Sequence, residues 1–270
     1  MPEPSPRRWQ PTLLIRATFA LHALALIAVI TLPSQWRWVL GAVVLNHTLL
    51  TLLGLLPRST GLGPNWTRLP AAATARNEIA LTIDDGPDPV VTPQVLDILD
   101  RYVAQATFFC FGEQAARHPE LCREIVRRGH AVENHSQHHH HHFSLLGYFG
   151  VLRELQAAQD TLTEITGLRP LFFRAPAGLR NPFLDPVLSR LGLQLASWST
   201  RAFDTRVGDV ERVRSMLLRG LQAGAILLLH DGNAARTPDG TPVILEVLPT
   251  VLASATAAHL RFVSLRRALT

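Results

Sequence analysis

Short apolar segments of strand character alternate with helical segments from residue 78 to the C-terminus, and this alternation limits the fold most strongly. Strands are predicted at 78–83, 106–111, 131–133, 172–174, 193–198, 225–229 and 261–265. Helices are predicted between them at 92–101, 113–128, 150–166, 182–191, 208–221 and 243–257. This order is typical of an α/β fold with a parallel sheet, and seven strands come close to a distorted (β/α) barrel.

Residues at the helix ends support these boundaries. Thr92 before Pro93 is expected to cap the first helix, because a hydroxyl can accept from the free N–H groups and proline fits the first turn. Gly129 and Gly167 are expected to end the second and third helices, where the chain often needs a left-handed conformation.

The N-terminal fifth has a different composition. Two apolar runs, 13–32 and 38–56, each have roughly the length of about 20 residues that crosses a bilayer. Trp9, Trp36 and Trp38 lie at their ends, as interfacial aromatic residues do. A membrane-anchoring hairpin is therefore predicted in 1–60, followed by a linker in 61–77 and a catalytic domain in 78–270. A secretory signal would explain only the first run, and two buried amphipathic helices are the remaining alternative.

Arginines flank this predicted hairpin on both sides. Arg16 lies at the start of the first run and Arg58 follows the second, whereas the short loop between the runs carries only Arg37. Because positive residues favour the cytoplasmic side, the catalytic domain is expected on the cytoplasmic face of a bacterial inner membrane.

The composition excludes several classes of site. All 26 basic residues are arginine, which excludes a Schiff-base lysine, a lysine general base and a phosphate-loop lysine. The net charge of +5 is scattered and forms no basic stripe with aromatics, so no nucleic-acid partner is expected. Cys110 and Cys122 have no zinc-ribbon spacing, and no protein partner can be inferred.

Polar side chains fall where the predicted strands end. Asp84 and Asp85 follow the first strand and His135 the third, and the later strands are followed by Arg174, Asp204 and His230. In a parallel barrel these carboxyl ends gather at one rim, where such enzymes place their chemistry.

The two acids after the first strand and the histidines after the third strand predict a metal site. Two adjacent carboxylates would repel unless a cation lies nearby, and the second carboxylate could then act as a base. His135 and His139 are four residues apart, so one helical turn would direct both imidazoles to a common point, although His138 in the same histidine run could also reach the metal. Zinc suits two histidines and a carboxylate, and cobalt or nickel could also be held.

Each motif also has a purely structural interpretation. The run from Asp84 to Pro89 could be only a turn. Arg174 could be an ordinary buried ion pair rather than a group that orients a carboxylate. His230 could be a core histidine bonded to Asp231 rather than a general acid.

Taken together and in order, five motifs resemble those of the polysaccharide deacetylases with a NodB-like domain, carbohydrate esterase family 4. They are Thr82-Ile83-Asp84-Asp85-Gly86, His135-Ser136-x-x-His139, Arg174-x-Pro176-x-Gly178, Trp198 with Asp204, and Leu228-x-His230. The resemblance covers about residues 78–270. It implies a distorted (β/α) barrel of NodB type and metal-dependent removal of an N-acyl group, with acetyl expected, from an amino sugar of a glycan or lipid-linked saccharide.

The resemblance also implies a role for each matching residue. Asp85, His135 and His139 would bind the metal, Asp84 would be the general base and His230 the general acid. Arg174 would position Asp84, and Asp204 would tune His230. Leu228 and Trp198 would line the acyl methyl, and a backbone N–H near Ala177 would bind the oxyanion. The family often has an aromatic where Ala177 stands, and Glu133 is also unusual at its position.

Two other functions fit the same scaffold. The chain could be a catalytically silent glycan-binding membrane protein, which the full set of acids and histidines argues against. It could instead be an amidohydrolase of non-sugar amides.

Overall fold

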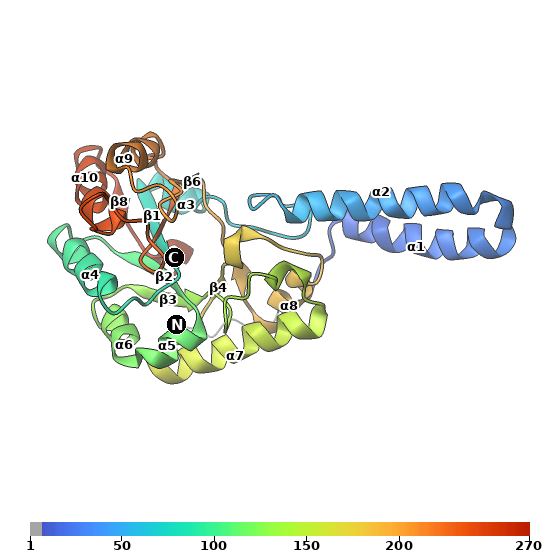
Figure 1. Ribbon diagram of the computed structural model, residues 1–270, viewed down its shortest axis with the longest axis horizontal. Coiled ribbons are helices and arrows are strands. Elements are labelled where there is room, and N and C mark those ends of the chain that lie inside the picture. The colour runs from blue at the N-terminus through green and yellow to red at the C-terminus, as the bar shows by residue number, and fades with distance from the viewer. Residues whose placement is uncertain (1–6) are drawn as a thin grey trace.

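The computed structural model describes residues 7–270, so the first six residues of the predicted hairpin segment lie outside the described residues. A parallel sheet curls into a half-barrel with helices around its outer face, and two N-terminal helices project from it as an antiparallel hairpin (Figure 1). The α/β class and the distorted-barrel architecture predicted from the alternation are confirmed.

Seven strands form one continuous path in the order β5-β4-β3-β2-β1-β7-β6, and β8 also pairs with β1. Every pair between these strands is parallel. The strands are β1 (Glu78–Asp84), β2 (Ala106–Cys110), β3 (Ala131–Asn134), β4 (Phe172–Phe173), β5 (Gln194–Leu195), β6 (Thr200–Arg201), β7 (Ile226–His230) and β8 (Arg261–Phe262).

The α-helices fall into the N-terminal pair and those of the barrel. They are α1 (Leu13–Thr31), α2 (Trp36–Gly54), α3 (Ala71–Ala75), α4 (Val91–Arg101), α5 (Gly112–Arg117), α6 (Pro119–Arg127), α7 (Tyr148–Thr166), α8 (Leu184–Leu191), α9 (Val210–Arg219) and α10 (Val243–Ala257). Short 3-10 turns are η1 (Pro33–Gln35), η2 (Phe143–Leu145), η3 (Pro176–Gly178) and η4 (Arg267–Leu269).

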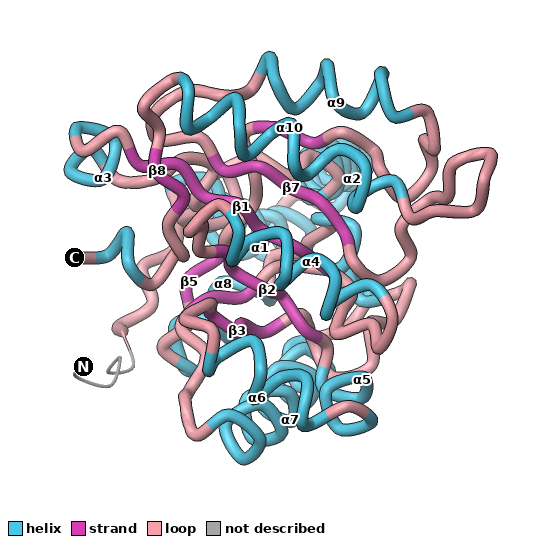
Figure 2. Tube along the Cα trace, turned by 90° about the vertical axis from the view of Figure 1, so that its left-hand side faces the viewer, coloured by secondary structure: helices cyan, strands magenta, loops and turns pink. Residues whose placement is uncertain are grey.

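Alternating side chains separate two cores. On β1, Leu81 and Ile83 pack outward with the apolar faces of the surrounding helices, which Figure 2 shows around the strands. Ala80 belongs to a second cluster inside the half-barrel, together with Phe109 and Leu228. Because successive side chains of a strand point to opposite faces, Thr82 and Asp84 share the inner face with Ala80.

Three predicted boundaries are wrong. Thr92 does not cap α4, because Val90 is the cap and Asp88 Oδ1 accepts from the N–H groups of Val90 and Val91. The single helix expected over 113–128 is two helices, α5 and α6, divided at His118 before Pro119. Proline cannot donate the hydrogen bond that would continue α5.

The strand expected at 193–198 is also different, because the sheet is open there. It consists of β5 alone, and a separate short strand β6 follows Trp198 on the opposite edge of the half-barrel. The segment after the hairpin lies across this opening, since Trp66 pairs with Ala196 beside β5 and Arg68 pairs with Ala225 beside β7. Gly167 ends α7 in a left-handed conformation as expected.

The helical hairpin is attached to the half-barrel at both of its ends. Before α1, Arg7 and Trp9 donate to the two carboxylate oxygens of Asp185 on α8, at 2.8 and 3.0 Å. At the end of α2, the Arg180 N–H donates to Gly54 O at 3.0 Å, and beyond it Ser197 Oγ donates to Pro57 O at 2.6 Å. Both helices are long and apolar enough to cross a membrane, and most of their side chains are exposed.

Candidate active site and metal centre

The sheet register brings two predicted site residues side by side. Asp84 ends β1 and pairs in parallel with His230, which ends β7. Both side chains are buried and lie on the inner face of the half-barrel, at its carboxyl rim. The sequence-based expectation that these residues meet at one rim is confirmed.

Asp85 is brought next to both predicted histidine ligands. Its Oδ1 lies 3.3 Å from His135 Nε2 and 3.2 Å from His139 Nε2. Burial acts to raise the pKa of Asp85, but hydrogen bonds from His135 and His139 outweigh it and hold the pKa well below its usual range. For ligands at about 2.0–2.1 Å, a tetrahedral zinc ion needs ligand atoms roughly 3.3 Å apart. The three residues therefore fit a divalent metal ion.

The geometry also selects the ligand atoms. His135 Nδ1 lies 2.8 Å from Arg174 O, which leaves Nε2 toward Asp85. His138, the open alternative to His139, turns its Nδ1 instead to Glu154 Oε1 at 2.8 Å. Second partners of this kind fix the tautomer and orientation of a metal-binding histidine.

The expectation that His135 and His139 share a helical turn is wrong. Residues 135–139 form a loop after β3 that contains two left-handed residues, Ser136 (φ 71°) and His139 (φ 50°). Asp85 (φ 72°) and Ala177 (φ 53°) have the same unusual conformation. Such backbone strain is retained where surrounding contacts impose it, and it clusters at functional sites.

Arg174 connects the base candidate to the interior of the half-barrel. Its buried guanidinium donates to Asp84 Oδ1 at 2.7 Å, to Thr82 Oγ1 at 2.8 Å and to the carbonyls of Ala196 and Ser197 at 3.1 and 2.8 Å. Burial lowers its pKa and Asp84 opposes that effect. One carboxylate oxygen of Asp84 is thus fixed, and the other lies 4.0 Å from His135 Nε2.

His230 is held by Asp204, not by its neighbour Asp231. Asp204 accepts from the His230 backbone N–H at 2.7 Å and lies 3.0 Å from His230 Nδ1. Burial acts to lower the pKa of His230, but the carboxylates, Asp204 foremost, raise it to about 9. His230 is consequently protonated at neutral pH, and its Nε2 is the atom left for a reactant.

Two further residues of this region, Asn233 and Asp231, were not predicted as site residues. Asn233 donates to the second oxygen of Asp85 at 3.4 Å. Asp231 accepts from Thr92 and from Gly232 N, and burial raises its pKa to about 7. The run Asp231-Gly232-Asn233 directly after His230 was the available signal. Glu133, noted as unusual, is structural, because it accepts from Leu171 N and Arg266 Nε.

The predicted substrate-contact residues lie at different depths. Leu228 is 1% exposed and Trp198 7%, both within the cluster inside the half-barrel. Ala177 is exposed at the rim, and none of the backbone hydrogen bonds among residues 7–270 uses its N–H.

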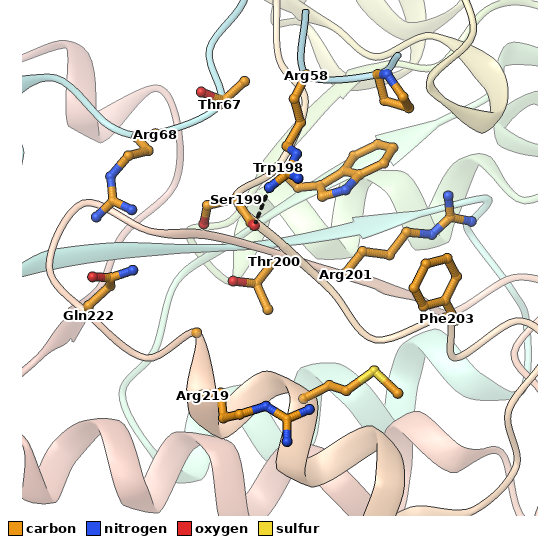
Figure 3. A pocket seen from close by; sticks show the side chains of 13 residues that line it. Arg58, Thr67, Arg68, Trp198, Ser199, Thr200, Arg201, Phe203, Arg219 and Gln222 are labelled. Atoms are coloured by element: carbon orange, nitrogen blue, oxygen red, sulfur yellow. Dashed lines mark hydrogen bonds between the residues drawn. The ribbon is translucent and has the colours of Figure 1, made fainter. Parts of the chain in front are cut away.

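A cavity of about 860 Å³ adjoins Trp198 where the half-barrel is open. Arg58, Arg68, Arg201 and Arg219 surround it, and Arg201 lies between the rings of Trp198 and Phe203 (Figure 3). Within residues 7–270, none of these four guanidinium groups forms an ion pair. Arg201 Nε is buried and has no hydrogen-bond partner there. The cavity is therefore strongly cationic.

Comparison with known proteins agrees with this geometry. The sequence model of the family described as polysaccharide deacetylase matches residues 71–196. The peptidoglycan-N-acetylglucosamine deacetylase of Bacillus cereus is 33% identical over 178 residues, which span 63% of this chain and 80% of that protein. The chitooligosaccharide deacetylase of Azorhizobium caulinodans is 36% identical over 165 residues, 60% of this chain and 78% of that protein.

The chain belongs to the polysaccharide deacetylase family. It is a carbohydrate deacetylase, a hydrolase of carbon–nitrogen bonds other than peptide bonds. A family 4 carbohydrate esterase from Streptomyces lividans, solved in complex with acetate, superposes with a TM-score of 0.62 at 28% identity. That match covers 68% of this chain and 91% of the other, so this deacetylase shares the family 4 fold.

Proposed function

We propose that this deacetylase removes an N-acetyl group from an amino sugar with the help of a divalent metal ion held by Asp85, His135 and His139. One observation carries the proposal: this carboxylate–imidazole cluster lies directly beside Asp84, with His230 on the adjacent strand. A water-activating hydrolase needs a metal site, a base and an acid within reach of one bond, and the candidates for these three roles are adjacent here.

The donor set favours zinc as the ion. Three protein ligands of nitrogen and oxygen type leave open positions, as catalytic zinc sites do, although the same donors also accept cobalt or nickel. When bound, such an ion polarises the amide carbonyl and makes a water molecule more acidic. Asn233 and the Arg174 carbonyl, which contact Asp85 and His135, keep the ligands in orientation.

Asp84 is the proposed general base. Arg174 binds Oδ1, so the other oxygen is the one that takes the proton of the attacking water. The guanidinium also keeps the carboxylate ionised inside the half-barrel, where an unpaired buried charge would be costly. Arg174 is therefore a positioning residue for Asp84.

His230 is the proposed general acid. Its Nδ1 faces Asp204, so Nε2 is the atom that gives a proton to the leaving nitrogen. The exposed Ala177 N–H is a candidate donor for the oxyanion of the tetrahedral intermediate. Leu228 and Trp198 are proposed as the apolar wall that the acetyl methyl faces.

The decisive variant is Asp84→Asn. It is expected to lower kcat at least about 10²-fold while the purified protein still retains its metal. Chitooligosaccharide is the test substrate, acetate release gives the rate, and elemental analysis gives the metal content. Asp88→Asn, a matched change in the following loop, serves as the control. Unchanged turnover in Asp84→Asn, or release of acetate from simple amides but not from the sugar, would contradict the proposal.

The hairpin is proposed to anchor the enzyme in a bacterial inner membrane, with the barrel on the cytoplasmic side. Its base contacts the loops after β3 and β4, because Leu145, Arg180 and Phe183 line an apolar cavity of about 560 Å³ together with α1 and α2 residues. Those loops belong to the same rim as the active site, so the rim would lie close to the bilayer. Arginines at both flanks favour the cytoplasmic orientation, and a reporter fused to the C-terminus tests it.

This placement and the arginine cavity favour a lipid-linked amino sugar as substrate. A polyprenyl diphosphate presents its sugar at the membrane surface, and its phosphates match four guanidinium groups that form no ion pair within residues 7–270. The relatives that act on peptidoglycan make an exported polymer the second candidate.

KM values for a diphosphate-linked sugar and for a neutral oligosaccharide distinguish a lipid-linked substrate from a polymer. The double variant Arg68→Gln/Arg219→Gln is expected to raise KM at least about 10-fold for N-acetylglucosamine on polyprenyl diphosphate and not for chitooligosaccharide. Arg117→Gln, an exposed arginine on α5, is the control. Equal KM changes for both sugars would favour the polymer.

A further inference from the structure

A second group of potential metal ligands includes both sequence neighbours of His139. His138 and His140 belong to the loop after β3, and Glu154 lies on α7. Glu154 Oε1 is 2.8 Å from His138 Nδ1 and 3.6 Å from His140 Nε2. One ligand atom from each of the three residues lies within 4.8 Å of the other two.

The Glu154 carboxylate forms no ion pair with an arginine in the described part of the chain. The Glu154 side chain is only 11% exposed. Its second oxygen accepts from the His138 backbone N–H at 3.1 Å. Since a buried carboxylate needs a positive partner, a cation held between it and the two imidazoles would supply one.

We propose that His138, His140 and Glu154 bind a second divalent transition-metal ion, separate from the one at Asp85. Two imidazole nitrogens and one carboxylate oxygen suit Zn²⁺, Co²⁺, Ni²⁺ and Cu²⁺ better than Mg²⁺ or Ca²⁺. The spacings of 2.8 and 3.6 Å bracket the 3.2 and 3.3 Å found in the cluster around Asp85. The imidazoles of His138 and His140 are about half exposed, so the ion can enter from solvent.

The imidazole rings at this site are stacked on one another. His138 and His140 stack with centroids 5.2 Å apart and planes at 22°, and His142 stacks on His140 at 4.9 Å and 18°. Stacked neighbours limit how far each imidazole can rotate. An ion would therefore bind rings that need little reorientation, which lowers the entropic cost of binding.

The site would also support the first one. His139, a ligand of the first ion, lies between His138 and His140 in the sequence and has a left-handed backbone conformation (φ 50°). An ion shared with Glu154 would fasten both neighbours of His139 to α7. Binding at the second site is therefore expected to tighten binding at the first, and this coupling is reciprocal.

Metal stoichiometry tests the proposal without reference to turnover. The full-length protein, purified in detergent and stripped of metal, is titrated with Co²⁺ alone while the visible d–d absorption and the bound metal are measured. Two equivalents per chain are expected for the wild type and one for His138→Ala/His140→Ala. Glu154→Gln is expected to weaken the second equivalent at least about 10-fold.

Two controls separate a built site from general histidine affinity. His141→Ala removes a histidine of the same run that lies outside the cluster, so it should retain two equivalents. Asp85→Asn should lose or weaken the other equivalent only. One equivalent in the wild type would overturn the proposal, and so would equal loss in His141→Ala and in the double variant. One equivalent in the wild type overturns the proposal whether or not a variant misfolds.

Discussion

Asp84 and His230 occupy paired positions at the ends of the adjacent parallel strands β1 and β7. This register places the proposed base and acid on one face, and neither needs a loop to bring it there. Each is then held by one charged side chain, Asp84 by Arg174 and His230 by Asp204. Substitutions of Arg174 and Asp204 should therefore alter catalysis through Asp84 and His230, and both can be tested by mutation.

Replacing Arg174 by lysine is expected to impair both stability and catalysis. A lysine ammonium cannot reproduce the planar fork that contacts Asp84, Thr82 and two carbonyls. Leaving part of this buried network unpaired should cost about 3 kcal/mol in the free energy of unfolding. Thermal unfolding and kcat are the measurements. Arg117 forms an exposed ion pair with Glu113, so Arg117→Lys should change the free energy of unfolding by less than about 1 kcal/mol.

The pH dependence of activity should depend on Asp204. With a pKa of about 9, His230 stays protonated at neutral pH, so kcat/KM should fall only as the pH rises through about 9. Asp204→Asn removes the main group that raises this pKa. At an ordinary histidine pKa near 6.5, the loss at pH 8 would be roughly 30-fold from protonation alone.

A matched carboxylate gives the control for that experiment. Asp209→Asn changes the exposed N-cap of α9 and keeps its capping ability, so the alkaline limb should not move. An Asp204→Asn profile that still falls near pH 9 would assign the limb to another group.

Buried His130 should make the fold sensitive to mild acid. Burial lowers its pKa to about 4, against about 6.5 in the unfolded chain. Between pH 6.5 and 4, His130 is protonated in the unfolded state but neutral in the folded state. Its contribution to the free energy of unfolding is therefore complete above pH 6.5 and is lost as the pH falls toward 4. At pH 5 this amounts to about 2 kcal/mol.

Comparison of variants isolates this contribution from other titrating groups. His130→Gln can still accept the Ala106 N–H that now donates to Nδ1 at 3.2 Å, and its unfolding should change less between pH 7 and 5 than that of the wild type. His259→Gln alters an exposed imidazole and should leave the wild-type slope. Parallel slopes for wild type and His130→Gln would refute the assignment.

Much of the fold was predictable because periodic burial and helix ends agree locally. The helix over 243–257 has the predicted bounds, and the strand ends at Asp84 and His230 fall within a residue of the expected places. The break before Pro119 was encoded in the sequence but was outweighed by the surrounding helical pattern. The short strand β6 could not be predicted, since two residues have no measurable period.

The site was predictable where the residue types themselves carry chemistry. The pairing of Asp85 with His135 and His139 followed from donor types, whereas their loop conformation did not, because nothing in a histidine or serine side chain specifies a positive φ. Glu154 and Asn233 were missed for another reason. Glu154 contacts His138, and Asn233 contacts Asp85, only because tertiary packing brings them together, and the sequence spacing does not indicate such contacts.

The contact between Pro57 and Gly178 should make the rim of the active site sensitive to one methyl group. Gly178 has φ +75°, and a Cβ there would lie 2.7 Å from both Pro57 Cβ and Trp198 Cη2. Gly178→Ala must therefore displace either the segment after the hairpin or the Trp198 ring.

Gly167 has a similar φ of +69° with nothing within 4 Å, so Gly167→Ala carries the backbone cost alone, about 1 kcal/mol. The excess loss of thermal stability in Gly178→Ala, about 1–3 kcal/mol, measures the displaced contact. A raised KM should accompany it, because Trp198 borders the arginine cavity. Equal stability of the two variants would show that Pro57 and Trp198 move freely.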